Sequence, residues 1–591
     1  MKADIKNLCW DTAALYPSPD ATALERDFED IAFRVREFRK QYLGMVASLS
    51  AEAFRDALIS YEELHEFIAK PQCYAYLLFA ADSGDDTNKR LSQRAAEFGN
   101  LTSRELLFFD LEIIQMEDSL FQAFLADPLL CKYRHYLESI RKFRLHTLTE
   151  QEENLLKQKS LTGTDAFSRL FDELSASFTY SMGVDGEERI WSGEELLALL
   201  HHPEAETRER AFSLFLERHG EHAIVFTAVF NNITLDHSQE LELRKYHSPM
   251  EPTNLGNELP ANVVERLMTV SESNYQLART YFQLKAQILN MTRLKNSDIY
   301  APVEESSRRF SFGEAKALVL DAYGQASSEF RDIIAEFFTE RRIDVLPRPG
   351  KSGGAFCMGV TPHSPPYVLL NFTGNLRDVA TLAHELGHGL HFVLAGRQSM
   401  LNYHPPLPLS ETASVFGEML LTRHLLERET DRSVKVALLC AKIEDIIATT
   451  FRQNVLTRFE ERIHLERQRG LLTTSRICDL WWEENDRLYG TAVEMIPSYR
   501  WGWSYISHFI HSRFYCYSYV FAELLVLSLY RKYVDEGDSF IPVYREMLCS
   551  GSSRSPVDTV APAGIDLTAP DFWQKGYDYL GELIHELEGL L

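Results

Sequence analysis

Residues Thr381-Leu-Ala-His384-Glu385-Leu-Gly-His388-Gly-Leu-His391 contain the pattern H-E-x-x-H. Apolar residues recur around it at steps of three and four, which predicts an amphipathic helix; they are Val379, Leu382, Leu386, Leu390 and Val393. On such a helix His384 and His388 share one face, so both imidazoles can bind one metal ion, and Glu385 beside them can act as a base. The stretch therefore predicts a metal site, whose third ligand has to come from elsewhere.

The composition is that of an ordinary globular protein. Of the 591 residues, 45% are hydrophobic and 25% are charged. The formal net charge of −25 argues against nucleic acid and anionic membranes as partners. The eight cysteines form no C-x-x-C pair, no signal peptide is visible, and the longest apolar run, around 519–530, is too short to span a bilayer. We expect a cytoplasmic protein without a nucleic-acid or membrane partner; the pattern leaves the oligomeric state open.

The chain is expected to be mainly α-helical. Residues 1–195 form a succession of amphipathic helical patterns without strand alternation, which we interpret as an N-terminal helical domain. Glycines near 182–193 suggest the boundary, and residues 196–591 form the predicted catalytic domain. No repeat of fixed period is visible.

A small β-sheet is predicted directly before the metal helix. Residues 344–375 contain five prolines, five glycines and two β-like runs, at 355–358 and 367–372. Gly350-Lys-Ser352 is not a phosphate loop, because Val345 stands where that motif needs glycine. A strand edge could align an extended peptide by main-chain hydrogen bonds, although plain hairpin packing explains the pattern equally well. The candidate residues for this role are Gly353, Gly354, Ala355 and Phe356, with the run 367–372 as the other option.

Two sources for the third ligand fit the sequence. A metzincin would need glycine at His391 and histidine at Leu394, so that class is excluded. His391 lies one turn beyond His388, but three turns of a straight helix diverge around a sphere of about 2 Å radius, which favours a supporting position. The alternative is a carboxylate from the next helix, where Glu411, Ser414 and Glu418 share one face and Ser410 is a candidate N-cap.

The motifs together resemble the oligoendopeptidase F group of the thimet-oligopeptidase-like zinc peptidases, family M3. The resemblance rests on residues 10–17, 349–357, 367–372, 376–379 and 384–388, and on the pattern Glu411-x-x-Ser414-x-x-x-Glu418. It implies one Zn²⁺ per chain with Glu411 as third ligand, and Ser414 and Glu418 as groups that orient the ligands. It also implies a two-lobed helical fold of the gluzincin type, with a deep channel that admits short unfolded peptides.

A second constellation resembles the same family. His508 is followed by Tyr515, Tyr517 and Tyr519, which by the resemblance supply hydrogen-bond donors to the substrate carbonyl and oxyanion. On a continuous helix Tyr515 and Tyr519 share a face and Tyr517 does not. We rank His508, Tyr515 and Tyr517 ahead of Tyr519. Ser507, Ile510 and Ala522 depart from the family's usual residues.

The predicted function is zinc-dependent endopeptidase hydrolysis of short peptides, with Glu385 as general base. A carboxypeptidase or dipeptidyl carboxypeptidase is the nearest alternative, and it would need a cationic clamp such as Arg500 or Arg513. A non-catalytic, zinc-retaining peptide-binding protein is the other. Cobalt or manganese could occupy the same ligands.

Overall fold

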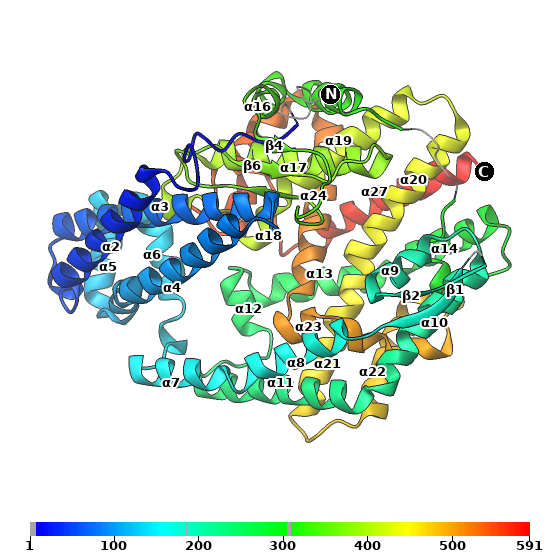
Figure 1. Ribbon diagram of the computed structural model, residues 1–591, viewed down its shortest axis with the longest axis horizontal. Helices are drawn as coiled ribbons and strands as arrows, with labels where there is room; N and C mark the ends of the chain where they lie inside the picture. Colours follow the sequence, from blue (N-terminus) through cyan, green and yellow to red (C-terminus); the bar gives the residue numbers. More distant parts are fainter. Residues whose placement is uncertain (1–7, 185, 304–308) are drawn as a thin grey trace. The chain divides into compact units, whose positions relative to one another are not determined.

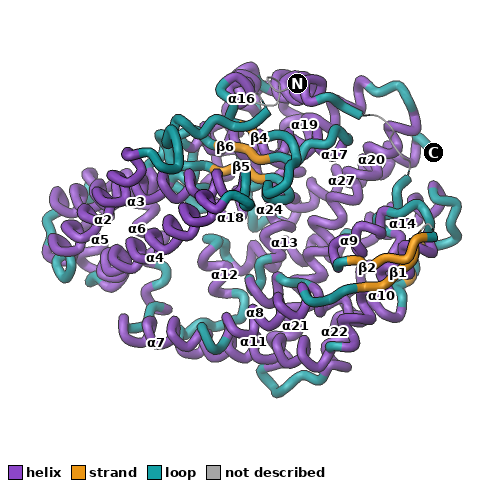
Figure 2. Tube along the Cα trace, in the orientation of Figure 1, coloured by secondary structure: helices purple, strands orange, loops and turns teal. Residues whose placement is uncertain are grey.

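The computed structural model describes residues 8–184, 186–303 and 309–591 (Figure 1). Helices dominate and the strands are short (Figure 2). The chain divides by contact into two compact units. Unit 1 comprises Met1–Arg144, Ser307–Glu427 and Lys532–Asp566, and unit 2 comprises Leu145–Ser306, Arg428–Arg531 and Leu567–Leu591. The mainly helical fold class is confirmed, whereas the division into residues 1–195 and 196–591 stays a prediction.

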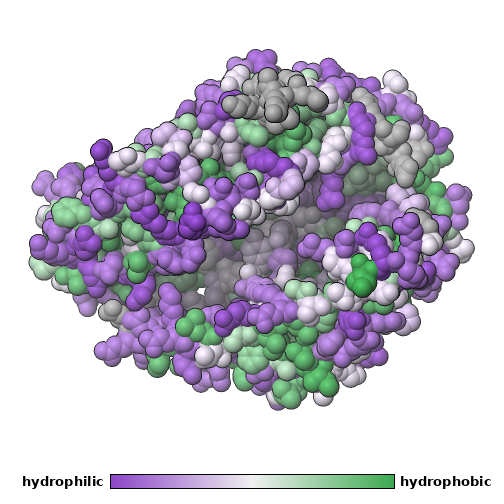
Figure 3. All heavy atoms as spheres, in the orientation of Figure 1, coloured by the Kyte–Doolittle hydropathy of each residue, from purple (hydrophilic) through white to green (hydrophobic). Residues whose placement is uncertain are grey.

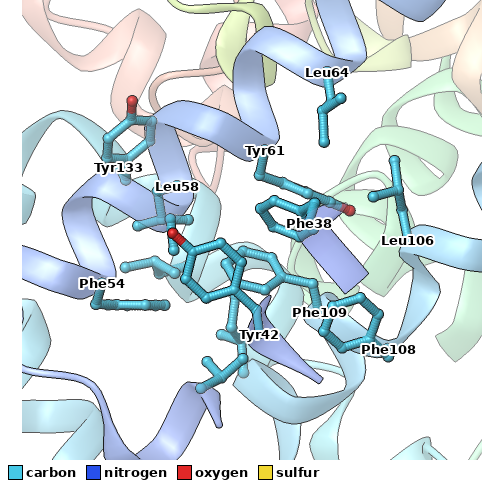
Figure 4. Packing of buried hydrophobic residues seen from close by; sticks show 14 of the residues in the cluster. Phe38, Tyr42, Phe54, Leu58, Tyr61, Leu64, Leu106, Phe108, Phe109 and Tyr133 are labelled. Carbon is cyan, nitrogen blue, oxygen red and sulfur yellow. The ribbon is translucent and has the colours of Figure 1, made fainter. Parts of the chain in front are cut away.

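The amino-terminal part of unit 1 is a helical layer built on aromatic side chains. Its helices are α2 (Thr22–Tyr42), α3 (Ala51–Ala81), α4 (Asp86–Gln115), α5 (Asp118–Ala126) and α6 (Arg134–Arg141). Figure 4 shows the rings that α2, α3 and α4 contribute: the centroid of Phe109 lies 5.1 Å from that of Phe38 and 4.8 Å from that of Tyr61. Aromatic residues bury large apolar areas, so this cluster stabilises the layer.

The rest of unit 1 surrounds the helix that carries H-E-x-x-H. Its elements are α15 (Phe312–Ala326), α16 (Ser328–Thr339), β4 (Ile343–Asp344), β5 (Phe356–Met358), β6 (Tyr367–Leu369), α17 (Leu376–Ala395), α18 (Leu407–Ser410), α19 (Thr412–Arg428), α25 (Ile541–Cys549) and α26 (Pro556–Val560). The sheet order is β4-β6-β5, with β6 parallel to β4 and antiparallel to β5. Helix α17 contacts β5 and β6, so the predicted sheet beside the motif helix is confirmed.

The segment 350–352 has a structural role. The ammonium of Lys351 is fully buried, 2.6 Å from a carboxylate oxygen of Asp344, and also donates to the carbonyl of Leu346 at 2.9 Å. Arg348 binds the same carboxylate. Gly350 has φ +83°, and a Cβ there would lie 2.5 Å from Asp82 Oδ1. Lys351 therefore links the loop at 350–352 to strand β4, which agrees with the prediction that Gly350-Lys-Ser352 is not a phosphate loop.

Unit 2 is also mainly helical. Its helices are α7 (Glu150–Ser160), α8 (Thr164–Ala176), α9 (Gly193–Ala198), α10 (Ala205–Glu221), α11 (Ala223–Leu243), α12 (Glu251–Gly256), α13 (Ala261–Ser273), α14 (Tyr275–Ile288), α20 (Arg432–Ile447), α21 (Gln453–Arg467), α22 (Thr474–Tyr489), α23 (His508–His511) and α27 (Pro570–Gly589). Helix α24 (Cys516–Glu536) begins in unit 2 and ends in unit 1. Strands β3 (Leu294–Lys295) and β7 (Val493–Glu494) pair in parallel.

One expectation for this region is wrong. We predicted no strands before residue 195, but β1 (Tyr180–Val184) and β2 (Glu187–Trp191) form an antiparallel hairpin. Their sequences do not alternate cleanly, since β2 is exposed except at Trp191. The pair Asp185-Gly186 between them is a sequence signal typical of tight hairpins.

The face drawn in Figure 3 is mostly hydrophilic, with hydrophobic residues in small groups. All eight cysteines are free. Across the described ranges we find no helix with both the length and the apolar character needed to cross a membrane.

Candidate metal centre

Helix α17 is fixed by its start and by its apolar face. Asn375 accepts a hydrogen bond from the backbone N–H of Asp378, while the carboxylate of Asp378 accepts from the N–H groups of Thr373, Gly374 and Asn375. This reciprocal cap satisfies N–H groups that the helix itself leaves without partners. Val379, Leu382, Leu386 and Leu390 are buried as predicted, and Val393 is only partly buried.

Helices α17 and α19 cross closely because each carries a glycine at the contact. A Cβ at Gly387 would lie 2.4 Å from the carbonyl oxygen of Ala413. A Cβ at Gly417 would lie 1.7 Å from the hydroxyl of Tyr323, which donates to the carbonyl of Ala383 at 2.8 Å. Any larger side chain would push the helices apart. The crossing brings the first residues of the α19 segment onto the histidine face of α17.

Three donor atoms form a nearly equilateral triangle at this crossing. His384 Nε2 and His388 Nε2 are 3.2 Å apart, and Glu411 Oε2 lies 3.3 Å from the first and 3.4 Å from the second. Ligands about 2.0–2.1 Å from a tetrahedral zinc ion lie about 3.3–3.4 Å from one another. The three residues are the one group in the described chain that could hold a metal ion. The triangle therefore fits a tetrahedral ion with one position left for water.

Two side chains hold these ligands in place. Glu418 Oε1 lies 2.6 Å from His384 Nδ1, the ring nitrogen that points away from the triangle. Ser414 donates to Glu411 Oε2 at 2.7 Å. Such outer contacts fix the orientation of a metal ligand. Burial lowers the pKa of His384, but Glu411 and Glu418 raise it well above the ordinary value.

The start of α19 differs from our expectation. Ser410 is the last residue of α18 and donates to the carbonyl of Leu407, so it is not the N-cap of the next helix. Glu411 stands between the two helices, and its carbonyl accepts from the N–H of Val415 at 3.2 Å. The proline-rich segment before α19 thus ends in the short helix α18, and Glu411 lies directly before the first residue of α19.

Glu385 lies beside the triangle and is only 6% exposed. Burial raises the pKa of its carboxyl, the two histidines lower it, and Glu411 and Glu418 raise it again, with a net rise. None of the described residues hydrogen-bonds this carboxylate. A carboxyl with a raised pKa and open oxygens suits proton transfer near neutral pH.

His391 is fully packed rather than part of the triangle. Burial lowers the pKa of its imidazole to about 3, and the ring bonds the backbone of Ser410, next to Glu411. Its Nδ1 has no partner among the described residues. The ring is therefore neutral near pH 7 and lies outside the triangle.

The loop residues Gly353, Gly354, Ala355 and Phe356 lead into β5, an edge strand. Strand β6 is central, so the alternative run 367–372 has no free edge. Asn371 donates to the carbonyls of Ser352 and Gly354, at 2.9 and 2.8 Å, and anchors the loop.

In unit 2, His508 groups with two of the three tyrosines. Its Nε2 is 3.2 Å from the hydroxyl of Tyr519, and its ring stacks on Tyr515 at 5.7 Å between centroids. Tyr517 is fully buried and accepts from Asn257 Nδ2 at 2.8 Å. The turn before Tyr515 is formed by Phe514, whose φ is +55° and whose N–H donates to the carboxylate of Glu460 at 2.9 Å.

The two arginines considered as clamps lie in the same unit. Arg500 is exposed and lies over the ring of Trp501. Arg513 has a buried Nε without a hydrogen-bond partner among the described residues. Burial raises the pKa of the nearby Glu460 carboxyl to about 8, although the charge of Arg513 lowers it in part.

Known proteins resemble this chain in sequence and in fold. The family model "Peptidase family M3" matches residues 198–579, and the model "Oligopeptidase F" matches residues 112–180. Oligopeptidase PepF of Bacillus subtilis is 26% identical over 98% of this chain and 87% of its own. The crystal structure of oligoendopeptidase-F from Enterococcus faecium has a TM-score of 0.72 at 24% identity, covering 96% of this chain and 98% of its own. A Chlamydophila abortus chain, provisionally assigned as a peptidase, has a TM-score of 0.89 at 24% identity, covering 99% and 98%.

The chain belongs to peptidase family M3. The family resemblance inferred from the motifs is thereby confirmed, and this M3 peptidase is a metallopeptidase. The cluster of His384, His388 and Glu411 lies wholly within unit 1, whereas His508 and the tyrosines lie in unit 2.

Sequence reasoning missed several residues that position the M3 centre. Gly387 and Gly417 set the helix crossing, and Tyr323 fills the space that Gly417 leaves. Glycine within a helical pattern was the available signal, since it is otherwise unfavourable there. The sequence Asn375-x-x-Asp378 was likewise a visible capping signal.

Proposed function

We propose that this M3 peptidase is a zinc-dependent endopeptidase that cleaves short unfolded oligopeptides. The observation that supports it best is the triangle of His384, His388 and Glu411 donors, about 3.3 Å on a side, with the open carboxyl of Glu385 beside it. Relatives named oligopeptidase and oligoendopeptidase support the substrate class.

His384, His388 and Glu411 would hold the ion, and two imidazoles with a carboxylate suit zinc. When bound, zinc lowers the pKa of a water ligand toward about 7 and polarises a carbonyl. Glu385 accepts a proton from the attacking water and returns it to the departing amine, which needs a carboxyl pKa raised toward neutrality. Glu418 keeps the His384 ring oriented, and Ser414 keeps the Glu411 carboxylate oriented.

The remaining roles rest on the family resemblance. His508, with Tyr515 and Tyr519, is proposed to donate hydrogen bonds to the tetrahedral oxyanion. We do not propose Tyr517 as a donor, because its hydroxyl is buried against Asn257. The outer edge of β5, entered through residues 353–356, is proposed to pair with the substrate backbone by strand addition.

Metal analysis combined with a cleavage map tests the proposal. A peptide of about ten residues, acetylated at one end and amidated at the other, should be cut internally, because an endopeptidase does not read free termini. A chelator should abolish cutting and zinc should restore it. Residues released only from free carboxyl termini would instead indicate a carboxypeptidase, and stoichiometric zinc without any cleavage would indicate a binding protein.

A further inference from the structure

Unit 2 contains a cavity of about 260 Å³ that the peptidase chemistry does not use. Its apolar wall includes Leu200, Phe282 and Ile447. Its polar wall includes Arg452 and Tyr505. At about 30 Å³ per water, the volume accepts on the order of ten non-hydrogen atoms. The cavity is thus large enough for a small organic molecule.

Arg452 enters this cavity from an irregular part of the helix. It ends the five-residue π-helical segment Ala448–Arg452 between α20 and α21. Such π-helical turns in an α-helix are rare and often mark functional sites, since they redirect side chains. The guanidinium donates to the hydroxyl of Tyr505 at 3.2 Å.

Arg452 has no carboxylate partner among the described residues. Other partly buried arginines do: Arg458 binds Glu272 at 2.7 Å, and Arg462 binds Glu484 at 2.7 Å. Burial lowers the pKa of Arg452, whereas four tyrosines around it raise the pKa overall; they are Tyr505, Tyr300, Tyr499 and Tyr489. A partly buried cation without a counter-ion is unfavourable, so the site is electrostatically incomplete.

A second donor points to the same conclusion. Asn296 lines the cavity and is only 5% exposed, yet its Nδ2 has no partner in the described chain. Its Oδ1 accepts from the N–H of Ile496 at 3.0 Å, which fixes the amide so that Nδ2 is the free end. A buried N–H group without an acceptor is costly, and an acceptor-only ligand would satisfy it.

The acidic residue in the wall does not neutralise Arg452. Glu444 also lines the cavity, but its carboxylate is bound by the ammonium of Lys285 at 2.5 Å and by the hydroxyl of Tyr281. That pair balances its own charge. The positive charge of Arg452 is therefore left for a ligand.

We propose that the Arg452 cavity binds a small organic carboxylate, with the carboxylate on Arg452 and Asn296 and the hydrocarbon part against Leu200, Phe282 and Ile447. Guanidinium and carboxylate match in charge and in planar geometry. The ligand is either a free short-chain acid or the carboxyl terminus of a short peptide. The inference does not rest on the proposed zinc chemistry, because none of the residues assigned to that chemistry lines the cavity.

Calorimetric titration of the full-length, zinc-loaded protein tests the proposal. Butanoate is compared with butanamide, and N-acetyl-leucine with N-acetyl-leucinamide. Each acid should bind at least about tenfold tighter than its amide, which lacks the charge. Binding of butanoate alone would identify a free acid, and binding of N-acetyl-leucine alone a peptide terminus. Equal binding of acid and amide, or no binding up to about 50 mM, overturns the proposal.

Variants locate the bound acid. Arg452→Met should weaken binding at least about tenfold, and Asn296→Asp should do the same by placing a negative charge in the cavity while keeping the side-chain shape. Arg500→Met is the matched control, because Arg500 is exposed and outside the cavity, and it should change binding less than about twofold. Binding that survives both cavity variants would lie elsewhere, for instance at the metal, and would refute the assignment. Thermal melts confirm that each variant is folded.

Discussion

The pKa values of His384 in unit 1 and His508 in unit 2 of this M3 peptidase are shifted in opposite directions. In unit 1, burial lowers the pKa of His384, but the carboxylates of Glu411 and Glu418 raise it well above normal. In unit 2, burial lowers the pKa of His508, and Arg452 and His511 lower it further. Carboxylates that stabilise a charged imidazole also stabilise a metal cation among the same atoms. The first group therefore suits a bound cation, and the second favours a neutral ring beside the Tyr519 hydroxyl.

The largest expected effect comes from Glu385, the proposed base between the histidines. Glu385→Gln keeps the size of the side chain but cannot accept a proton, so we expect cleavage of a blocked peptide to fall by about 10²- to 10⁴-fold. Metal content measured by mass spectrometry should stay at one zinc per chain. Unchanged turnover would remove Glu385 from its assigned role.

The second effect distinguishes Tyr519 from Tyr517 by their influence on kcat. Tyr519→Phe removes the hydroxyl beside His508 and should lower kcat by about 10²- to 10³-fold with little change in KM. Tyr517→Phe is the matched control: it removes a buried acceptor for Asn257 and should lower stability by about 1–3 kcal/mol. Equal losses of kcat in the two variants would contradict the distinction.

The third effect concerns the support of the metal ligands. Glu418→Gln removes the charge that His384 Nδ1 faces, and the zinc dissociation constant should rise by about 10- to 100-fold. Competition with a calibrated chelator measures this change. Glu427→Gln, an exposed position on the same helix, serves as control and should leave zinc affinity as it is.

The last effect is a pH dependence of stability in unit 2. Burial raises the pKa of Glu460 from 4.5 to about 8. Because the folded protein holds this proton where the unfolded chain releases it, the contribution of Glu460 to stability declines as pH rises from about 4.5 to about 8.

Glu460→Gln should flatten this decline, and urea unfolding at pH 5, 7 and 9 measures it. The neighbouring Glu461→Gln should leave the pH slope in place. An identical slope in wild type and Glu460→Gln would show that Glu460 is ionised throughout. The test also bears on the His508 group, because Glu460 holds the turn at Phe514.

Local patterns predicted much of the centre. The face shared by His384 and His388 follows from a four-residue step on a helix. The same step groups Tyr515 with Tyr519, yet we ranked Tyr517 ahead of Tyr519, whereas the structure places the Tyr519 hydroxyl beside His508 and the Tyr517 hydroxyl against Asn257. Residue spacing left His391, Glu411 and Glu418 open as third ligand, and the family resemblance chose Glu411. The hairpin β1-β2 was missed because an exposed strand lacks the alternation on which the prediction relied. Ser410 was misplaced because the break before α19 contains a helical turn of its own.

The sequence by itself determined the helical class, the family and the two histidines with their glutamate, because helix periodicity and motif spacing are local properties that survive without knowledge of packing. Only the tertiary structure decided that Glu411 completes a triangle with them, since this depends on two glycines that allow helices α17 and α19 to touch. It also decided that Arg452 faces tyrosines and an amide in a cavity, because segments separated by more than 100 residues form that wall. Contacts between distant segments arise from packing, which no local pattern encodes.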